Sequence, residues 1–179
     1  MYITMRIIDL SLEINNNLPV FEGDPKAEIE ELQTFKKDGW NMKRFHISGH
    51  DGTHVNVQIH GLAKGKNLDK YKLEDFIGEA VLFESIKDIQ PDIGLIVAKR
   101  NIDKTLAQII VDRRPKFVGL SSRYELNVDI EKFFFKNDIL VYERIAHTNK
   151  LPKRFIFHGV PLKIKNGDGS PVRAYAIVN

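Results

Sequence analysis

Short runs of apolar residues, separated by turn residues, recur along most of the chain. Alternation of apolar and polar positions, together with enrichment in valine, isoleucine and phenylalanine, is typical of β-strands. The pattern predicts strands at residues 6–12, 29–35, 42–48, 80–83, 117–120, 139–145 and 171–178. Strands therefore dominate the expected structure.

Helical periodicity is scarcer than strand periodicity. The clearest helix is predicted at residues 103–111, where apolar residues follow an i, i+3, i+4 spacing and Asn101 or Asp103 can cap the first turn. Shorter helices are predicted at residues 73–77 and 129–136.

The C-terminal segment, residues 161–178, has the pattern of a β-hairpin. Asn166-Gly167 and Asp168-Gly169 supply residues that readily adopt positive φ, and β-like runs flank them. With a prior of about 150 residues per domain, and without an evident linker or repeat, the chain is expected to form one domain, residues 1–179.

Composition excludes several classes of protein. Apolar residues make up 42% and charged residues 28% of the chain, as in globular and not in disordered proteins. No apolar run approaches the roughly 20 residues of a membrane helix, and charges interrupt the N-terminal stretch, so neither a membrane span nor a signal peptide is predicted. The absence of cysteine excludes thiolate metal sites and favours a cytoplasmic location.

The charge balance is mildly basic. The chain has 27 Lys and Arg against 24 Asp and Glu, a formal net charge of +3. Because the basic residues are scattered among acidic ones, without a basic stripe or an aromatic platform, nucleic-acid binding is not expected. The expected partner is a small molecule.

Four of the six histidines lie in one segment, FHISGHDGTHVNVQIHG, at His46, His50, His54 and His60. His50 and His54 would share one face of a helix, at the i, i+4 spacing of zinc-binding helices. The glycines, and the alternation of β-branched with polar residues, favour a strand instead. On a strand, His54, Asn56 and His60 would face one side and the valines would enter the core.

Clustered imidazoles are typical of metal sites, because imidazole nitrogen is the commonest metal ligand in proteins. A third ligand is needed, and Glu143 is a candidate since Ile139, Val141, Glu143 and Ile145 alternate along one predicted strand. A carboxylate among apolar residues is costly to bury without a partner. A metal ion, an arginine or solvent at the strand end would each lower that cost.

Several segments match one known family together. His50-Asp51-Gly52-Thr53-His54 has the form H-x-G-T-H, and residues 56–60 continue the same signature. Residues 7–25 contain the two motifs Asp-Leu-Ser and Gly-Asp-Pro. Residues 65–83 and 161–178 match later segments of the same family. In this combination the chain resembles the cyclase family, metal-dependent hydrolases typified by bacterial kynurenine formamidase.

The resemblance implies a fold, an assembly and an activity. The fold would be a mixed α/β domain of the swivelling β/β/α type, assembled as a homodimer or homotetramer. The activity would be hydrolysis of a small amide or lactone at a divalent metal ion, zinc or manganese, in one site. The best-known substrate type of the family is an aryl formamide, N-formylkynurenine.

The resemblance also assigns roles to individual residues. By position, the metal ligands would be His50, His54, Asn56, Glu131 and Glu143. His60 falls on the catalytic acid/base, and an imidazole can exchange protons with water and with a leaving amine near neutral pH. Phe21 lies where the family has an aromatic residue in the substrate pocket.

Two ligand positions depart from the family pattern. Asn56 stands where the family has a bridging aspartate, and Glu131 stands where it has a histidine. The carboxylate count is unchanged while one nitrogen ligand is lost, which would favour harder ions such as manganese over zinc. The departures also leave open a catalytically silent relative that binds a small molecule or a partner. Asp24 and Asp168 are expected to hold turns.

Overall fold

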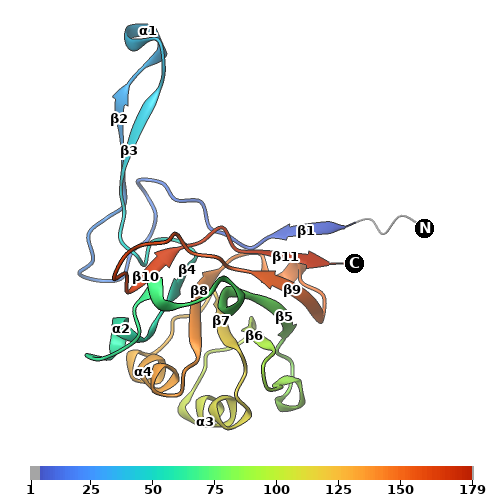
Figure 1. Cartoon of the computed structure of the whole chain (residues 1–179). Coiled ribbons are helices and arrows are strands. Elements are labelled where there is room, and N and C mark those ends of the chain that lie inside the picture. The colour runs from blue at the N-terminus through green and yellow to red at the C-terminus, as the bar shows by residue number, and fades with distance from the viewer. Residues whose placement is uncertain (1–4, 179) are drawn as a thin grey trace.

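The computed structural model describes residues 5–178, with eleven strands and four α-helices along this part of the chain (Figure 1). The strands are Arg6–Asp9 (β1), Glu28–Gln33 (β2), Met42–His46 (β3), His54–Asn56 (β4), Ile77–Leu82 (β5), Gly94–Val97 (β6), Phe117–Ser121 (β7), Leu140–Ile145 (β8), Arg154–His158 (β9), Gly169–Pro171 (β10) and Tyr175–Val178 (β11). The α-helices are Phe35–Asp38 (α1), Gln58–Gly61 (α2), Lys104–Arg113 (α3) and Val128–Lys136 (α4). Short 3-10 helices lie at Leu68–Lys70, Leu73–Phe76, Ile86–Asp88 and Thr148–Lys150.

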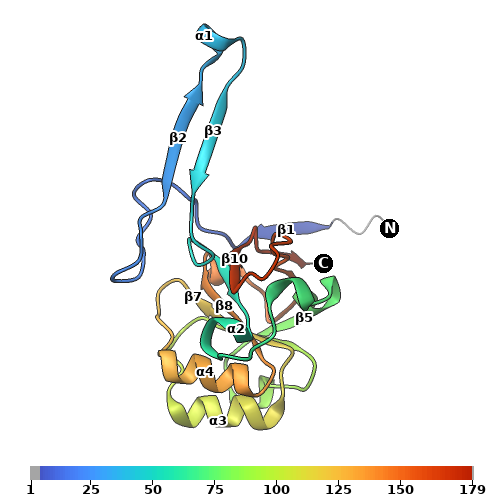
Figure 2. The same ribbon diagram turned by 60° about the vertical axis from the view of Figure 1, so that its left-hand side comes forward.

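Nine strands form one sheet, in the order β1-β11-β9-β5-β6-β7-β8-β4-β10. Strands β5 to β8 are parallel to one another, and the strands on either side of them pair antiparallel. Helices α3 and α4 connect the parallel strands and lie side by side below the sheet in both views (Figures 1 and 2). Parallel strands joined in this way are covered on both faces, which explains their continuous apolar sequences. The predicted strand-rich α/β class is confirmed.

The central strands place alternate side chains in two cores. Phe117, Tyr142 and Phe157 pack on one face, with ring centroids 4.9, 5.0 and 5.3 Å apart. Ile110 and Phe134, from α3 and α4, are fully buried in the core on the other face. The sheet is therefore a rigid support for residues at its ends.

Strand β8 does not keep this alternation to its end. Val141 lies in the core beside the helices, but Ile145 lies in the opposite core with Leu140 and Tyr142. Arg144 has a left-handed backbone, with φ 56°, and the pairing with β7 shifts register beside it. The prediction that Ile139, Val141, Glu143 and Ile145 share one face is therefore wrong at Ile145, because a bulge adds one residue to the count.

Strands β2 and β3 form a separate ribbon that projects from the body and carries α1 at its tip (Figures 1 and 2). All five residues of β3 are exposed. The ribbon is held by local cross-strand contacts, since Glu30 lies 3.8 Å from Arg44 and 3.3 Å from His46. An isolated two-stranded ribbon has little stability of its own.

The predicted C-terminal hairpin is wrong. Within residues 161–168 the only pairing is a single bridge from Pro161 to Val172. The turn at Asn166, with φ 57°, leads instead into β10, which pairs with β4, while β11 pairs with β1 and β9. The turn at Asn166 was identified correctly, but Gly167, Asp168 and Gly169 do not have positive φ, and pairing with distant strands decided where the chain goes afterwards.

The predicted strand through residues 54–60 is also wrong beyond Asn56. The chain leaves β4 and forms the turn of helix α2, so His60 does not continue the strand of His54. The predicted helices at 103–111 and 129–136 are confirmed as α3 and α4. The Asp103 carboxylate caps α3 by accepting from the Leu106 N–H at 2.8 Å, and Asn127 caps α4. None of the described helices is long and apolar enough to span a membrane.

Candidate metal and catalytic site

One cavity of about 280 Å³ collects all seven residues that the sequence singled out. They come from four separate parts of the chain, around residues 21, 50–60, 131 and 143: Phe21, His50, His54, Asn56, His60, Glu131 and Glu143. The cavity lies where β4 and β8 run side by side, since His54 pairs with Glu143 and Asn56 with Val141. Antiparallel pairing therefore brings residues about ninety positions apart into contact.

The side chain of Asn56 is the centre of a polar network. Its Nδ2 donates to Glu131 Oε1 at 2.7 Å and to Glu143 Oε1 at 3.0 Å, and its Oδ1 accepts from His50 Nδ1 at 2.8 Å. An amide between two carboxylates must turn its N–H₂ toward them, because carboxylates only accept. As placed, Asn56 links the three flanking side chains and its own oxygen is directed to His50.

His54 is held as a neutral imidazole. It is almost fully buried, and burial lowers the pKa of His54 to about 3. Its Nδ1 donates to the Gly52 carbonyl at 2.9 Å, so the lone pair of Nε2 is directed to the other side, 3.9 Å from Glu143 Oε1. A carbonyl that fixes the tautomer in this way is the usual support of a metal-binding histidine.

Glu131 and Glu143 are two carboxylates in one poorly solvated place. Burial, together with the negative charge of Glu131, raises the pKa of Glu143 to about 7. Burial also raises the pKa of Glu131, against the opposing effect of its hydrogen bond from Asn56. The negative charge on either carboxylate makes ionisation of the other less favourable, and a cation bound beside both would make their ionisation favourable.

A second group of possible ligands adjoins this pair. Asp168 Oδ2 lies 3.1 Å from His50 Nε2 and 3.3 Å from His60 Nδ1, and the ligand atoms of all three lie within 4.8 Å of one another. The rings of His50 and His60 are 4.1 Å apart at their centroids. A Cβ at Gly169 would lie 2.8 Å from the His50 ring, so glycine is needed where β10 passes the site.

Asp168 was missed as a site residue. Its neighbours Gly167 and Gly169 were interpreted as turn chemistry, and Asp168 does follow a turn, but its carboxylate points to the histidines. The resemblance of residues 161–178 to a later segment of the family was the available signal. Asp24, also expected to hold a turn, lines the cavity too.

The pair His54 and Glu143 has the spacing of two ligands of one divalent cation. Two ligand atoms that each lie about 2.0–2.2 Å from an ion are at most about 4.3 Å apart, and the separation of His54 Nε2 from Glu143 Oε1 is 3.9 Å. The lone pair and the carboxylate face each other without a hydrogen bond between them. Imidazole nitrogen with carboxylate oxygen suits zinc and manganese.

Part of the cavity wall is apolar. Phe21, 59% exposed, lies at the mouth with Tyr124, Leu126 and Val128. These side chains leave a surface for a flat apolar group beside the polar centre. Arg173 does not line this cavity and binds Asp9 on the surface, with Nη2 2.7 Å from Oδ2.

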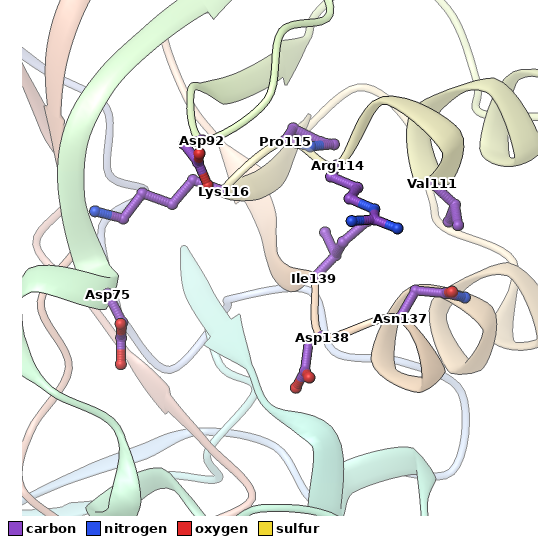
Figure 3. A pocket seen from close by; sticks show the side chains of 9 residues that line it. All are labelled: Asp75, Asp92, Val111, Arg114, Pro115, Lys116, Asn137, Asp138 and Ile139. Atoms are coloured by element: carbon purple, nitrogen blue, oxygen red, sulfur yellow. The ribbon is translucent and has the colours of Figure 1, made fainter.

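A larger cavity, about 450 Å³, lies at the opposite end of the parallel strands. Figure 3 shows Asp75, Asp92 and Asp138 around it, together with the basic side chains of Arg114 and Lys116. It contains no histidine, and among residues 5–178 the only close group of three possible metal ligands is His50, His60 and Asp168. Ligands of open α/β sheets bind at the carboxyl ends of the strands, where the histidine cavity lies.

Comparisons with known proteins give matches that cover most of this chain. A family model described as "Putative cyclase" matches residues 8–138. A kynurenine formamidase of Salinibacter ruber is 24% identical over 95% of this chain and 96% of its own length. The isatin hydrolase A structure from Labrenzia aggregata has a TM-score of 0.79 at 20% identity, covering 97% of this chain and 94% of that one. A structure described as a potential metal-dependent hydrolase with cyclase activity has a TM-score of 0.80 at 18% identity, covering 98% and 99%.

Proposed function

Since the chain belongs to the cyclase family, we propose that it is a metal-dependent hydrolase of a small amide or lactone, with aryl formamides such as N-formylkynurenine as the leading substrates. The observation that carries the proposal is the convergence of three histidines with the carboxylates of Glu131 and Glu143 on one partly apolar cavity, and of the Asp168 carboxylate on two of these histidines. The similarity to proteins named kynurenine formamidase and isatin hydrolase supports the same class of reaction.

We propose that His54 and Glu143, the pair at ligand spacing, would hold the cation together with Glu131, and that the adjoining group of His50 and Asp168 would supply further ligands. A bound divalent ion supplies a Lewis acid that polarises a carbonyl and makes water more acidic. His54 is already deprotonated and oriented for this role. One ion, zinc or manganese, is proposed, and the two glutamates favour manganese.

His60 is proposed as the residue that moves protons. With a proton on Nδ1, His60 donates to Asp168 Oδ2, which leaves the lone pair of Nε2 free to accept a proton. Asp168 then orients His60 much as a carboxylate orients the base in hydrolytic triads. His60 takes a proton from the attacking water and returns it to the leaving amine, a contribution of about 10²–10⁴-fold.

The apolar mouth is proposed as the binding surface for the aryl part of the substrate. Phe21, Tyr124 and Val128 line it, and an aromatic ring would pack there while the amide points to the histidines.

Hydrolysis of formanilides and lactones tests this function. Protein purified without chelator is assayed with added zinc, manganese or magnesium, with chelated protein as the control. Metal-dependent release of formate, lost in His54→Ala, is expected. Metal binding without hydrolysis of any amide or lactone would instead identify a catalytically silent relative.

We further propose that the chain forms a homodimer or homotetramer through its β2–β3 ribbon. The ribbon exposes Phe35, Trp40 and Phe45. Strand β2 carries three glutamates and β3 carries a lysine and an arginine, so a second copy related by two-fold symmetry would set acidic against basic strands.

A further inference from the structure

The bulge in β8 places two consecutive side chains in the same cavity. Neighbouring residues of a regular strand point to opposite faces. Glu143 and Arg144 nevertheless both line the histidine cavity, because Arg144 has a left-handed backbone. Left-handed conformations cost free energy in residues other than glycine, and bulges beside active sites commonly redirect a side chain.

Specific contacts hold Arg144 in this conformation. Thr53 Oγ1 donates to the Arg144 carbonyl at 2.6 Å, and Thr53 itself is buried within the histidine motif. Beyond the bulge, Ile145 turns inward over Gly119, where a Cβ would lie 2.4 Å from the Ile145 side chain. Residues of both β7 and β8 therefore support the left-handed backbone of Arg144, and this backbone sets the direction of the Arg144 side chain.

Arg144 is the only permanently charged cation among the described residues that line this cavity. Acidic side chains surround the same space, but none within residues 5–178 forms an ion pair with Arg144 at 4.0 Å or less, although other arginines on the surface do pair. The only side-chain hydrogen bond of Arg144 within these residues goes to the carbonyl of Pro19, in the loop that leads to Phe21. A guanidinium has five N–H donors, so most of them remain available.

We propose that Arg144 binds a carboxylate of the substrate and so makes the enzyme selective for aryl amides that carry an anionic group. The planar guanidinium binds a carboxylate through two parallel hydrogen bonds, which gives orientation as well as affinity. The inference rests on the proposed hydrolase function, because it names the substrate class of that same site.

The position of Arg144 relates this selectivity to the chemistry. Arg144 directly follows Glu143, a proposed ligand, and contacts the loop before Phe21, which lines the mouth. A carboxylate bound by Arg144 would draw the aryl group against Phe21 and hold the amide near His60. Arg144 is thus a specificity-determining residue and does not itself take part in proton transfer.

A matched pair of substrates tests the inference. N-formylkynurenine and its carboxamide differ only in the charge and hydrogen-bonding capacity of one group. Wild type should prefer the carboxylate in kcat/KM by about tenfold or more, mainly through KM. Arg144→Gln should remove that preference while changing the carboxamide by less than about threefold, and Arg144→Lys should restore part of it.

Arg123→Gln serves as the control, because it removes an exposed positive charge that does not line the cavity. Equal losses for both substrates in Arg144→Gln would overturn the inference and leave Arg144 as a support of the Pro19 loop. If wild type hydrolyses neither compound, the proposed function fails for aryl formamides. The inference is then tested by calorimetric binding of kynurenine and kynurenine amide to the metal-loaded protein, where equal affinity in wild type overturns it.

Discussion

The β4 end of the large sheet and the β2–β3 ribbon are adjacent in sequence but differ in burial and in where their contacts come from. All three residues of β4 are buried, and all five residues of β3 are exposed. His54 in β4 has a side chain 5% exposed, and Glu143 from a distant segment lies beside it. His46 in β3 has a side chain 50% exposed, and its side-chain polar contact is with Glu30 across the ribbon. Two histidines eight positions apart therefore differ in burial and in their polar contacts, and these environments decide whether an imidazole can serve a binding site.

The largest expected difference between the two regions is the effect on kcat of removing one histidine from each. His60→Ala is expected to lower kcat by about 10²–10⁴-fold while the metal content is retained, because His60 is proposed to move protons and not to bind the ion. His46→Ala should leave kcat unchanged within about twofold. The measurement is steady-state hydrolysis with metal analysis of both variants, and equal activity of His60→Ala and wild type would remove His60 from the mechanism.

Truncating one phenylalanine in each region compares their packing. Phe135 is fully buried and its ring lies 6.4 Å from the His60 ring, while Phe45 is 61% exposed. Phe135→Ala should lower the free energy of unfolding by about 3–5 kcal/mol, and Phe45→Ala by no more than about 0.5 kcal/mol. Urea unfolding of both variants, at a dilution at which light scattering gives the mass of one chain, measures this, and similar losses there would contradict the exposed environment of Phe45 in the single chain.

The carboxylates of the site should make stability depend on pH in a way the ribbon does not. The pKa of Glu143 is about 7 in the folded protein, above its ordinary value of 4.5. The folded state thus binds more protons than the unfolded state between these values. Metal-free protein should lose stability as the pH rises from about 4.5 through 7, by up to about 3 kcal/mol.

The sign is opposite for His54, whose lowered pKa adds stability as the pH rises from about 3 to 6.5. Glu143→Gln isolates the carboxylate, since His54 contributes to both proteins. Urea unfolding with chelator present, at pH 5 and pH 8, should show wild type losing stability relative to the variant at the higher pH. A difference between the two proteins that does not change with pH would contradict the proposed cost of the buried charge.

The smallest expected effect on the folded chain concerns assembly. Phe45→Asp in the ribbon should lower the molar mass in light scattering to that of one chain while the far-UV spectrum and the metal content stay the same. Leu73→Asp, at an apolar position that is 65% exposed on the body, is the matched control and should leave the mass unchanged. A wild-type mass of one chain at micromolar concentration would contradict assembly through the ribbon.

Local pattern was enough to predict some of this structure. The glycines and β-branched residues around His54 identified β4, and the caps of α3 and α4 lie within one or two residues of their predicted ends. The resemblance to the family brought together Asn56, Glu131 and Glu143, which periodicity alone could not have done. Residues that match the family's motifs were therefore predicted correctly as neighbours, and two of them, Asn56 and Glu143, lie on the paired strands β4 and β8.

Pairing between distant segments could not be predicted in this way. The helical turn of α2 follows only three residues of β4, and the left-handed Arg144 shifts the faces of β8, so counting by twos fails at both places. Asp168 reaches the histidines because β10 pairs with β4 across more than a hundred residues. Nothing within its own turn indicates that neighbour.

Direct titration of chelated protein with Mn²⁺ and Zn²⁺ by calorimetry tests the central claim, that this cavity binds one catalytic cation. One ion per chain should bind to wild type, and His54→Ala and Glu143→Gln should each weaken that binding by about a hundredfold or more. His46→Ala should bind as wild type does. Binding of equal strength in wild type and in the His54 and Glu143 variants would contradict the account, and so would no binding at all.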